Sequence, residues 1–102
     1  MTNCIFCKIL NKEIPSAFVY EDDYCFAIND INPKAKKHIL VIPKEHVESL
    51  NEVEDSNLIK HLFEAIKNIN KKENISHFKT VINTGKDAGQ EVMHLHIHIL
   101  AN

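Results

Sequence analysis

The chain has 102 residues and a net charge of −2, and all twelve of its basic residues are lysines. This length suits one domain, 1–102, with one core, and the apolar fraction of 44% is ordinary for a globular protein. The absence of arginine argues against nucleic acid as a partner, and no apolar run is long enough to cross a membrane. Because residues 1–4 also lack the features of a signal peptide, a cytoplasmic location is expected.

The N-terminal residues predict a short helix. Residues 4–10 carry apolar side chains at helical spacing, and Thr2 or Asn3 is expected to cap the helix. This spacing places Cys4 and Cys7 on one side of the helix. The odd number of cysteines argues against a disulfide framework, which leaves this pair as half of a metal site or as two packed thiols.

Three strands are expected next. Residues 18–21 and 24–28 predict a hairpin around the turn at 22–23. The lysine-rich segment 34–37 is expected to be a solvated turn. The nearly continuous apolar run 38–42 then predicts a central strand that Pro43 ends.

The second half of the chain predicts a long helix and two further strands. The helix should begin at residue 55 or 56, run to about residue 72, and bury an apolar stripe of Leu58, Ile59, Leu62, Phe63, Ile66 and Ile69. Residues 78–83 and 92–100 are the predicted strands, with a loop at 84–89. The order of elements indicates an α+β fold with a mostly antiparallel sheet of about five strands, a short N-terminal helix and one long helix.

Three of the seven histidines alternate with aliphatic residues in the last predicted strand. On a strand, His94, His96 and His98 would project from one face, while the aliphatic residues would face the core. Such a row can bind one zinc ion with a position left open for water, or it can hold one imidazole as a nucleophile.

The histidine strand and the loop before it resemble the histidine triad (HIT) superfamily, specifically its Hint-like, nucleotide-binding branch of purine nucleoside phosphoramidases. The resemblance rests on the alternating run 94–100 preceded by Gly89-Gln90. It extends over nearly the whole chain, in order, through the segments Ile5-Phe6-x-Lys8-Ile9, Lys12-Glu13-Ile14-Pro15, Glu21-Asp22-Asp23, Asp30-Ile31-x-Pro33 and His38-x-Leu40-Val41-Ile42-Pro43-Lys44-x-His46. It implies a HIT-like fold and a homodimer whose subunits join through strand and helix contacts.

The resemblance also implies a hydrolase or transferase that cleaves nucleoside 5′-phosphoramidates, or related nucleotidyl substrates, at the α-phosphorus. The middle histidine, His96, would form a covalent nucleotidyl-histidine, and no cofactor would be required for this chemistry. His98, His94 and Gln90 are the other expected catalytic residues. The alternatives are a dinucleoside polyphosphate hydrolase of the same superfamily, a three-histidine zinc hydrolase, and a non-catalytic, zinc-stabilised nucleotide sensor or interaction module.

The same resemblance assigns the residues that would bind a purine nucleotide carrying an AMP or GMP moiety. Its phosphate would contact Asn83, Gly89, Gln90 and the backbone N–H of Glu91 or Val92. Asp30 would accept the ribose hydroxyls. The remaining expected substrate-binding residues, four of which would wall the base, are Phe6, Ile9, Ile28, Ile31, Asn29 and His38. Many phosphoramidases carry Ser or Thr where this chain has Glu91, so its handling of the leaving group is expected to differ.

A structural zinc ion is the cofactor that the resemblance implies. A closed zinc site needs four ligands, of which a Cys-x-x-Cys pair supplies two. In bacterial histidine-triad proteins that carry this pair, the other two ligands correspond to His46 and His94. Cys4, Cys7, His46 and His94 are therefore the expected metal ligands, with two buried thiols as the alternative.

Overall fold

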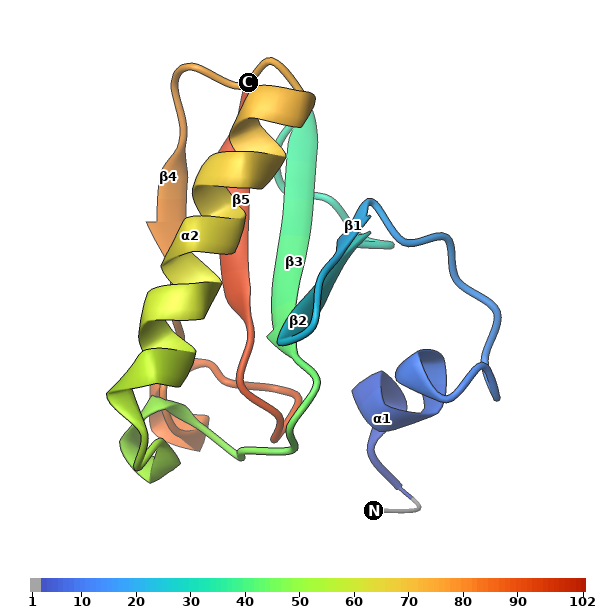
Figure 1. The fold of residues 1–102 in the computed structure, drawn as a ribbon, viewed down its shortest axis with the longest axis vertical. Coiled ribbons are helices and arrows are strands. Elements are labelled where there is room, and N and C mark those ends of the chain that lie inside the picture. Colours follow the sequence, from blue (N-terminus) through green and yellow to red (C-terminus); the bar gives the residue numbers. More distant parts are fainter. Residues whose placement is uncertain (1–2) are drawn as a thin grey trace.

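The computed structural model describes residues 3–102 and has one five-stranded antiparallel sheet with the order β1-β2-β3-β5-β4 (Figure 1). Two α-helices and two short 3-10 helices complete the fold, which confirms the predicted α+β class with one short and one long helix. The elements are α1 Ile5–Leu10, β1 Tyr20–Glu21, β2 Cys25–Asn29, β3 Lys37–Pro43, η1 Leu50–Glu52, α2 Ser56–Lys72, β4 Lys79–Val81, η2 Lys86–Ala88 and β5 Ile97–Ala101.

Helix α2 lies across β3 and β5 on one face of the sheet (Figure 1). Its carboxylate cap is Asp55, which accepts the backbone N–H of Asn57 at 2.9 Å. The inward-facing side chains pack on the sheet and form the larger part of the core: Leu62, Ala65, Ile66, Ile69, Ile39, Val41, Ile97 and Ile99. The predicted stripe was wrong at Phe63, which is 42% exposed because it follows Leu62 by about 100° around the helix. Within residues 3–102, neither helix has the length and apolarity needed to span a bilayer.

The opposite face of the sheet is covered only in part. Phe6 and Ile9 of α1 pack on Phe26, Ile28, Leu40 and Ile42, which form a second core cluster. Leu40 on β3 pairs with His98 on β5, and His38 pairs with Leu100, so these four side chains project from the same face. The part of this face that α1 does not cover is where the candidate site lies.

The last strand is shorter than predicted, and this changes the position of His94. Strand β5 begins at Ile97, so only His98 of the three histidines lies in the strand. His96 still faces the cavity with His98, whereas the expectation of a shared face was wrong for His94. The segment before β5 is held by the end of β3 and the residues after it: the His94 ring bonds the carbonyl of Pro43, the last residue of β3, at 2.8 Å, and the Leu95 N–H donates to the Val47 carbonyl at 2.7 Å. These contacts replace strand pairing and turn the His94 side chain into the interior.

Other boundaries also differ from the sequence prediction. Helix α1 begins at Ile5, and its cap is Cys4, whose sulfur accepts the Cys7 N–H at 3.4 Å. Asn3 is therefore not the cap, and Thr2 lies outside the described residues. Strands β1 and β4 are two and three residues long, shorter than the predicted strands 18–21 and 78–83.

Candidate functional site

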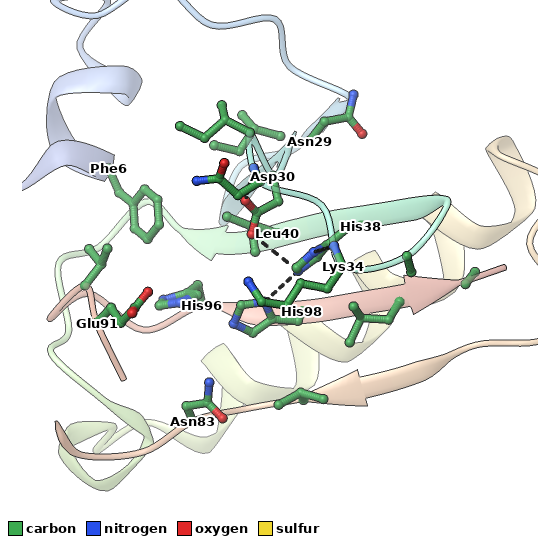
Figure 2. Close-up of a pocket in the computed structure, with 18 of the residues that line it drawn as sticks. Phe6, Asn29, Asp30, Lys34, His38, Leu40, Asn83, Glu91, His96 and His98 are labelled. Carbon is green, nitrogen blue, oxygen red and sulfur yellow. Dashed lines mark hydrogen bonds and ion pairs between the residues drawn. The ribbon is translucent and has the colours of Figure 1, made fainter. Parts of the chain in front are cut away.

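A cavity of about 1060 Å³ opens on the uncovered face of the sheet (Figure 2). Its walls come from α1, the loop after β2, the facing strands β3, β5 and β4, and the loop before β5. It brings together the predicted catalytic residues His96 and His98 and most of the residues that the sequence predicts to bind substrate, namely Phe6, Ile9, Ile28, Asn29, Asp30, Ile31, His38, Asn83, Gly89, Glu91 and Val92. Of the predicted catalytic and substrate-binding residues, Gln90 and His94 do not line it.

His96 is held in one orientation at the floor of the cavity. Its ring is 8% exposed and packs edge-on against Phe6, with ring centroids 5.2 Å apart. Nδ1 lies 2.8 Å from the backbone carbonyl of His94. Since a carbonyl can only accept, Nδ1 carries the hydrogen, and the neutral ring keeps its lone pair on Nε2. His96 therefore offers the cavity a nitrogen that can act as a nucleophile.

A chain of hydrogen bonds fixes the neighbouring histidines. The backbone N–H of Lys34 donates to Nδ1 of His38 at 3.1 Å, so the hydrogen of His38 is on Nε2. That Nε2–H donates to Nδ1 of His98 at 2.8 Å and also lies 3.4 Å from the Asp30 carboxylate. The hydrogen of His98 is therefore on its own Nε2, which is buried and has no hydrogen-bond partner among residues 3–102. This orphaned donor belongs to a residue that lines the cavity.

The electrostatics keep His98 neutral. Burial is the main cause that lowers its pKa from 6.5 to about 4, and the neighbouring charges of His96, His38 and Lys34 lower it further, against an opposing effect of Asp30. Burial likewise lowers the pKa of His94. Near neutral pH, His98 is thus a hydrogen-bond donor without a positive charge.

Gln90 anchors the loop before β5 instead of facing the cavity. Its side-chain oxygen accepts the Gly85 N–H at 2.8 Å, and its amide nitrogen donates to the carbonyls of Glu48 at 2.6 Å and Val92 at 3.0 Å. Both amide hydrogens are therefore used inside the protein. Of the hydrogen bonds formed within the described chain, none uses the backbone N–H of Glu91 or Val92 as donor.

Gly89 and Asn83 shape the wall beside these free N–H groups. Gly89 has φ +96°, a left-handed conformation that glycine adopts without strain. A Cβ atom at Gly89 would lie 3.8 Å from the Asn83 side chain. Glycine at this position therefore permits the turn that brings Asn83 and the loop to the cavity together.

The other end of the cavity suits a nucleoside. One Asp30 oxygen caps the loop by accepting the Asn32 N–H at 2.8 Å, and the second faces His38. Phe6 and Ile28 are buried, whereas Ile31 is 89% exposed at the rim and presents an uncovered apolar side chain. The carboxylate and these apolar walls match the chemistry of a ribose and a base.

The structure adds cavity residues that the sequence interpretation missed, among them Lys34, Leu40, Val81 and Leu100. The segment 34–37 was expected to be a solvated turn, and Lys34, Lys36 and Lys37 are indeed exposed. Figure 2 shows in addition that Lys34 lies alongside His98 in the cavity. Lys37 belongs to β3 and pairs with Glu73 at 2.7 Å. The lack of arginine was the available signal, because an anion site in this chain has only lysine as a permanently charged donor.

His94 belongs to a second cluster, with Cys4, Cys7 and His46, which is a candidate metal centre. Nδ1 of His94 lies 3.2 Å from the Cys4 sulfur and 3.7 Å from the Cys7 sulfur, and Nδ1 of His46 lies 3.3 Å from the Cys7 sulfur. Tetrahedral zinc with ordinary bond lengths separates sulfur and nitrogen ligands by about 3.6 Å. The His94 Nε2–H is taken by the Pro43 carbonyl, so its Nδ1 lone pair faces the thiols.

The candidate metal centre lies outside the cavity. All four donors lie outside the cavity lining, and His96 belongs to neither group of possible metal ligands in the described residues. Burial, followed by the neighbouring Cys4, raises the pKa of the Cys7 thiol to about 11. Metal binding must therefore displace its proton, and a zinc ion shared by the three triad histidines does not fit this geometry.

Comparison with known proteins gives consistent matches. The family described as HIT domain matches residues 11–102. Protein HitA from Neisseria gonorrhoeae is 50% identical over 103 residues, which cover 98% of this chain and 96% of that protein. Among solved structures, a HIT family hydrolase from Legionella pneumophila matches with a TM-score of 0.92 at 39% identity, covering 98% of this chain and 93% of the other. A histidine triad nucleotide-binding protein from Candida albicans matches with a TM-score of 0.85 at 32% identity, covering 95% and 73%.

Proposed function

Because this chain belongs to the HIT domain family, we propose that it is a nucleotide hydrolase that cleaves nucleoside 5′-phosphoramidates at the α-phosphorus. The observation that carries this proposal is His96. Its Nδ1–H is bound to the His94 carbonyl, which leaves the Nε2 lone pair for attack. The Legionella and Candida proteins, described as a hydrolase and as nucleotide-binding, support the reaction type and the ligand.

In the first step, the Nε2 lone pair of His96 forms a bond to phosphorus. The bond between phosphorus and the amine breaks, and the departing amine nitrogen takes a proton from water at the open side of the cavity. The imidazole then carries a positive charge, which the hydrogen bond from Nδ1–H to the His94 carbonyl stabilises. In the second step, water attacks phosphorus and gives a proton to the hydroxide left by the first step, the phosphorus–Nε2 bond breaks with its electron pair returning to Nε2, and the nucleoside monophosphate leaves.

Charge on the phosphate is met by groups that have no other partner. The Nε2–H of His98 is the buried orphan donor, and the backbone N–H groups of Glu91 and Val92 are free in the described chain. Asn83 and Lys34 also line the cavity. Fixed donors of this kind stabilise a transition state without having to reorganise.

The remaining cavity walls are proposed to bind the nucleoside part of the substrate. Asp30 is proposed to accept the ribose hydroxyls, and Phe6, Ile9, Ile28 and Ile31 to enclose a purine base. Because these walls are aliphatic or aromatic, they support binding of both AMP and GMP moieties with weak discrimination between them.

Zinc and a second subunit complete the proposal. Cys4, Cys7, His46 and His94 would hold a structural zinc ion that ties α1 to the segment before β5. A homodimer is supported by the position of β4 at the edge of the sheet and by Phe78 beside it, which is 44% exposed. A cytoplasmic location stays a prediction.

Release of AMP from an adenosine 5′-phosphoramidate tests the proposed activity. The wild-type protein is expected to release AMP, and His96→Ala is expected to abolish this release. The matched control is His61→Ala, which removes a histidine that stacks on Tyr24 outside the cavity and should leave the rate unchanged. Nucleotide binding without turnover would favour the sensor alternative, and faster cleavage of a dinucleoside polyphosphate would favour the other hydrolase class.

A further inference from the structure

We propose that the Glu91 side chain selects substrates whose leaving group carries a positive charge. This inference rests on the proposed function and defines its substrate class further. It concerns the carboxylate of Glu91, whereas the phosphate contact proposed above uses the backbone N–H of the same residue.

The carboxylate is placed beside the reacting centre. Glu91 is exposed, lines the cavity together with His96, and points toward the His96 ring in Figure 2. The free backbone N–H and the carboxylate belong to the same residue, so if the N–H meets the phosphate, the carboxylate is within reach of groups that extend from that phosphate.

This carboxylate has no partner inside the described protein. Of the two carboxylates that line the cavity, Asp30 is engaged by the Asn32 N–H and by His38. Within residues 3–102, Glu91 forms no ion pair, and its carboxylate accepts no hydrogen bond. Its charge is therefore available to a ligand.

A carboxylate without a partner would repel a phosphate bound beside it, because like charges repel. Lys34 lies beside His98, where it can meet the charge of the α-phosphate (Figure 2). The Glu91 carboxylate then remains free to interact with the leaving group that extends from phosphorus toward the open side of the cavity. An ammonium group there would be attracted, whereas a further phosphate or a carboxylate would be repelled. This arrangement favours phosphoramidates of diamines or basic amino acids over dinucleoside polyphosphates.

The test compares three adenosine 5′-phosphoramidates of alkylamines of equal length, whose far ends are an ammonium, a hydroxyl or a carboxylate. Dissociation constants are measured in the His96→Ala background, in which the compounds stay intact, with Glu91 present or replaced in Glu91→Gln. The ammonium compound is expected to bind roughly two- to fivefold more tightly than the hydroxyl compound, the range of one partly exposed ion pair, and the carboxylate compound more weakly. Glu91→Gln should remove this ranking.

The matched control is Asp87→Asn, which removes one negative charge from the same loop at a residue outside the cavity lining and should preserve the ranking. Equal binding of the three compounds, or a ranking that survives Glu91→Gln, would overturn the inference. Cleavage by protein with His96 intact is scored separately. If protein with His96 intact does not cleave the compounds, but the ranking of dissociation constants depends on Glu91 as expected, the proposed reaction is contradicted and the role of Glu91 is still supported.

Discussion

Replacing Gln90 with alanine is expected to destabilise the whole protein, because this side chain joins three segments of the chain. Its amide connects Gly85, Glu48 and Val92 through three hydrogen bonds, and the residue is 4% exposed. A net contribution of about 1 kcal/mol per bond gives a loss of roughly 3 kcal/mol in the free energy of unfolding. This is a large part of the stability of a small domain.

Urea unfolding followed by circular dichroism measures this loss. Gln90→Glu is the sharper variant, since a carboxylate can still accept the Gly85 N–H but has no hydrogen for the carbonyls of Glu48 and Val92. It should be at least as destabilising as alanine. Lys86→Ala, an exposed residue of the same loop, serves as the control and should change the free energy of unfolding by less than about 0.5 kcal/mol.

The competing interpretation is that Gln90 donates to the substrate phosphate. It predicts unchanged stability in both variants, with a loss of affinity for AMP. That outcome would refute the loop-anchoring role derived from the hydrogen bonds.

Three further predictions concern the metal, the buried histidine and the cavity lysine. A chelator should lower the melting temperature of zinc-loaded protein but not that of Cys7→Ser, which lacks the full donor set. AMP release measured below the melting temperature should survive chelation, and loss of AMP release would contradict a purely structural role of the metal. The pKa of His98 is about 4 in the folded protein and about 6.5 in an unfolded chain, so the unfolded chain binds more protons between these two pH values. The free energy of unfolding should therefore fall as the pH falls from about 6.5 to about 4. His98→Gln should flatten this part of the pH curve measured by urea titration, and an unchanged slope would contradict the prediction. Lys34→Gln should lower kcat/KM about fivefold at low salt and less at high salt, whereas Lys36→Gln, outside the cavity lining, should leave it unchanged; equal effects of the two variants would exclude a specific role for Lys34.

Local patterns in the sequence were sufficient for the parts of the fold that repeat regularly. The spacing of Leu62, Ile66 and Ile69 predicted the buried side of α2, and the apolar run 38–42 predicted the central strand β3. Alternation also placed His96 and His98 on the cavity side, because side chains two residues apart share a face in extended chain.

Two site features depend on contacts between distant residues, and no local pattern indicates them. The family resemblance, not a local pattern, grouped His94 with Cys4; in the structure its ring bonds Pro43, 51 residues earlier, and faces Cys4. Gln90 turns inward because the Glu48 carbonyl, 42 residues earlier, accepts its amide hydrogen. In both cases the direction of a side chain in irregular structure is set by tertiary partners.

Lys34 shows a different limit. A run of lysines in a turn normally points to solvent, and the charge pattern alone predicts this. Lys34 is exposed as this predicts, but the hydrogen bond from its backbone to His38 also holds the loop against the cavity. One lysine of the run is thereby placed beside His98, while Lys37 pairs with Glu73.

The most direct test of the account is to trap the covalent intermediate. Wild-type protein is mixed rapidly with an adenosine 5′-phosphoramidate, quenched under conditions that preserve a phosphorus–nitrogen bond, digested, and analysed by mass spectrometry. The account predicts an adenylyl group on the peptide that contains His96, located on His96 itself and absent from His96→Ala. AMP release without any adduct, or an adduct on His94 or His98, would contradict it.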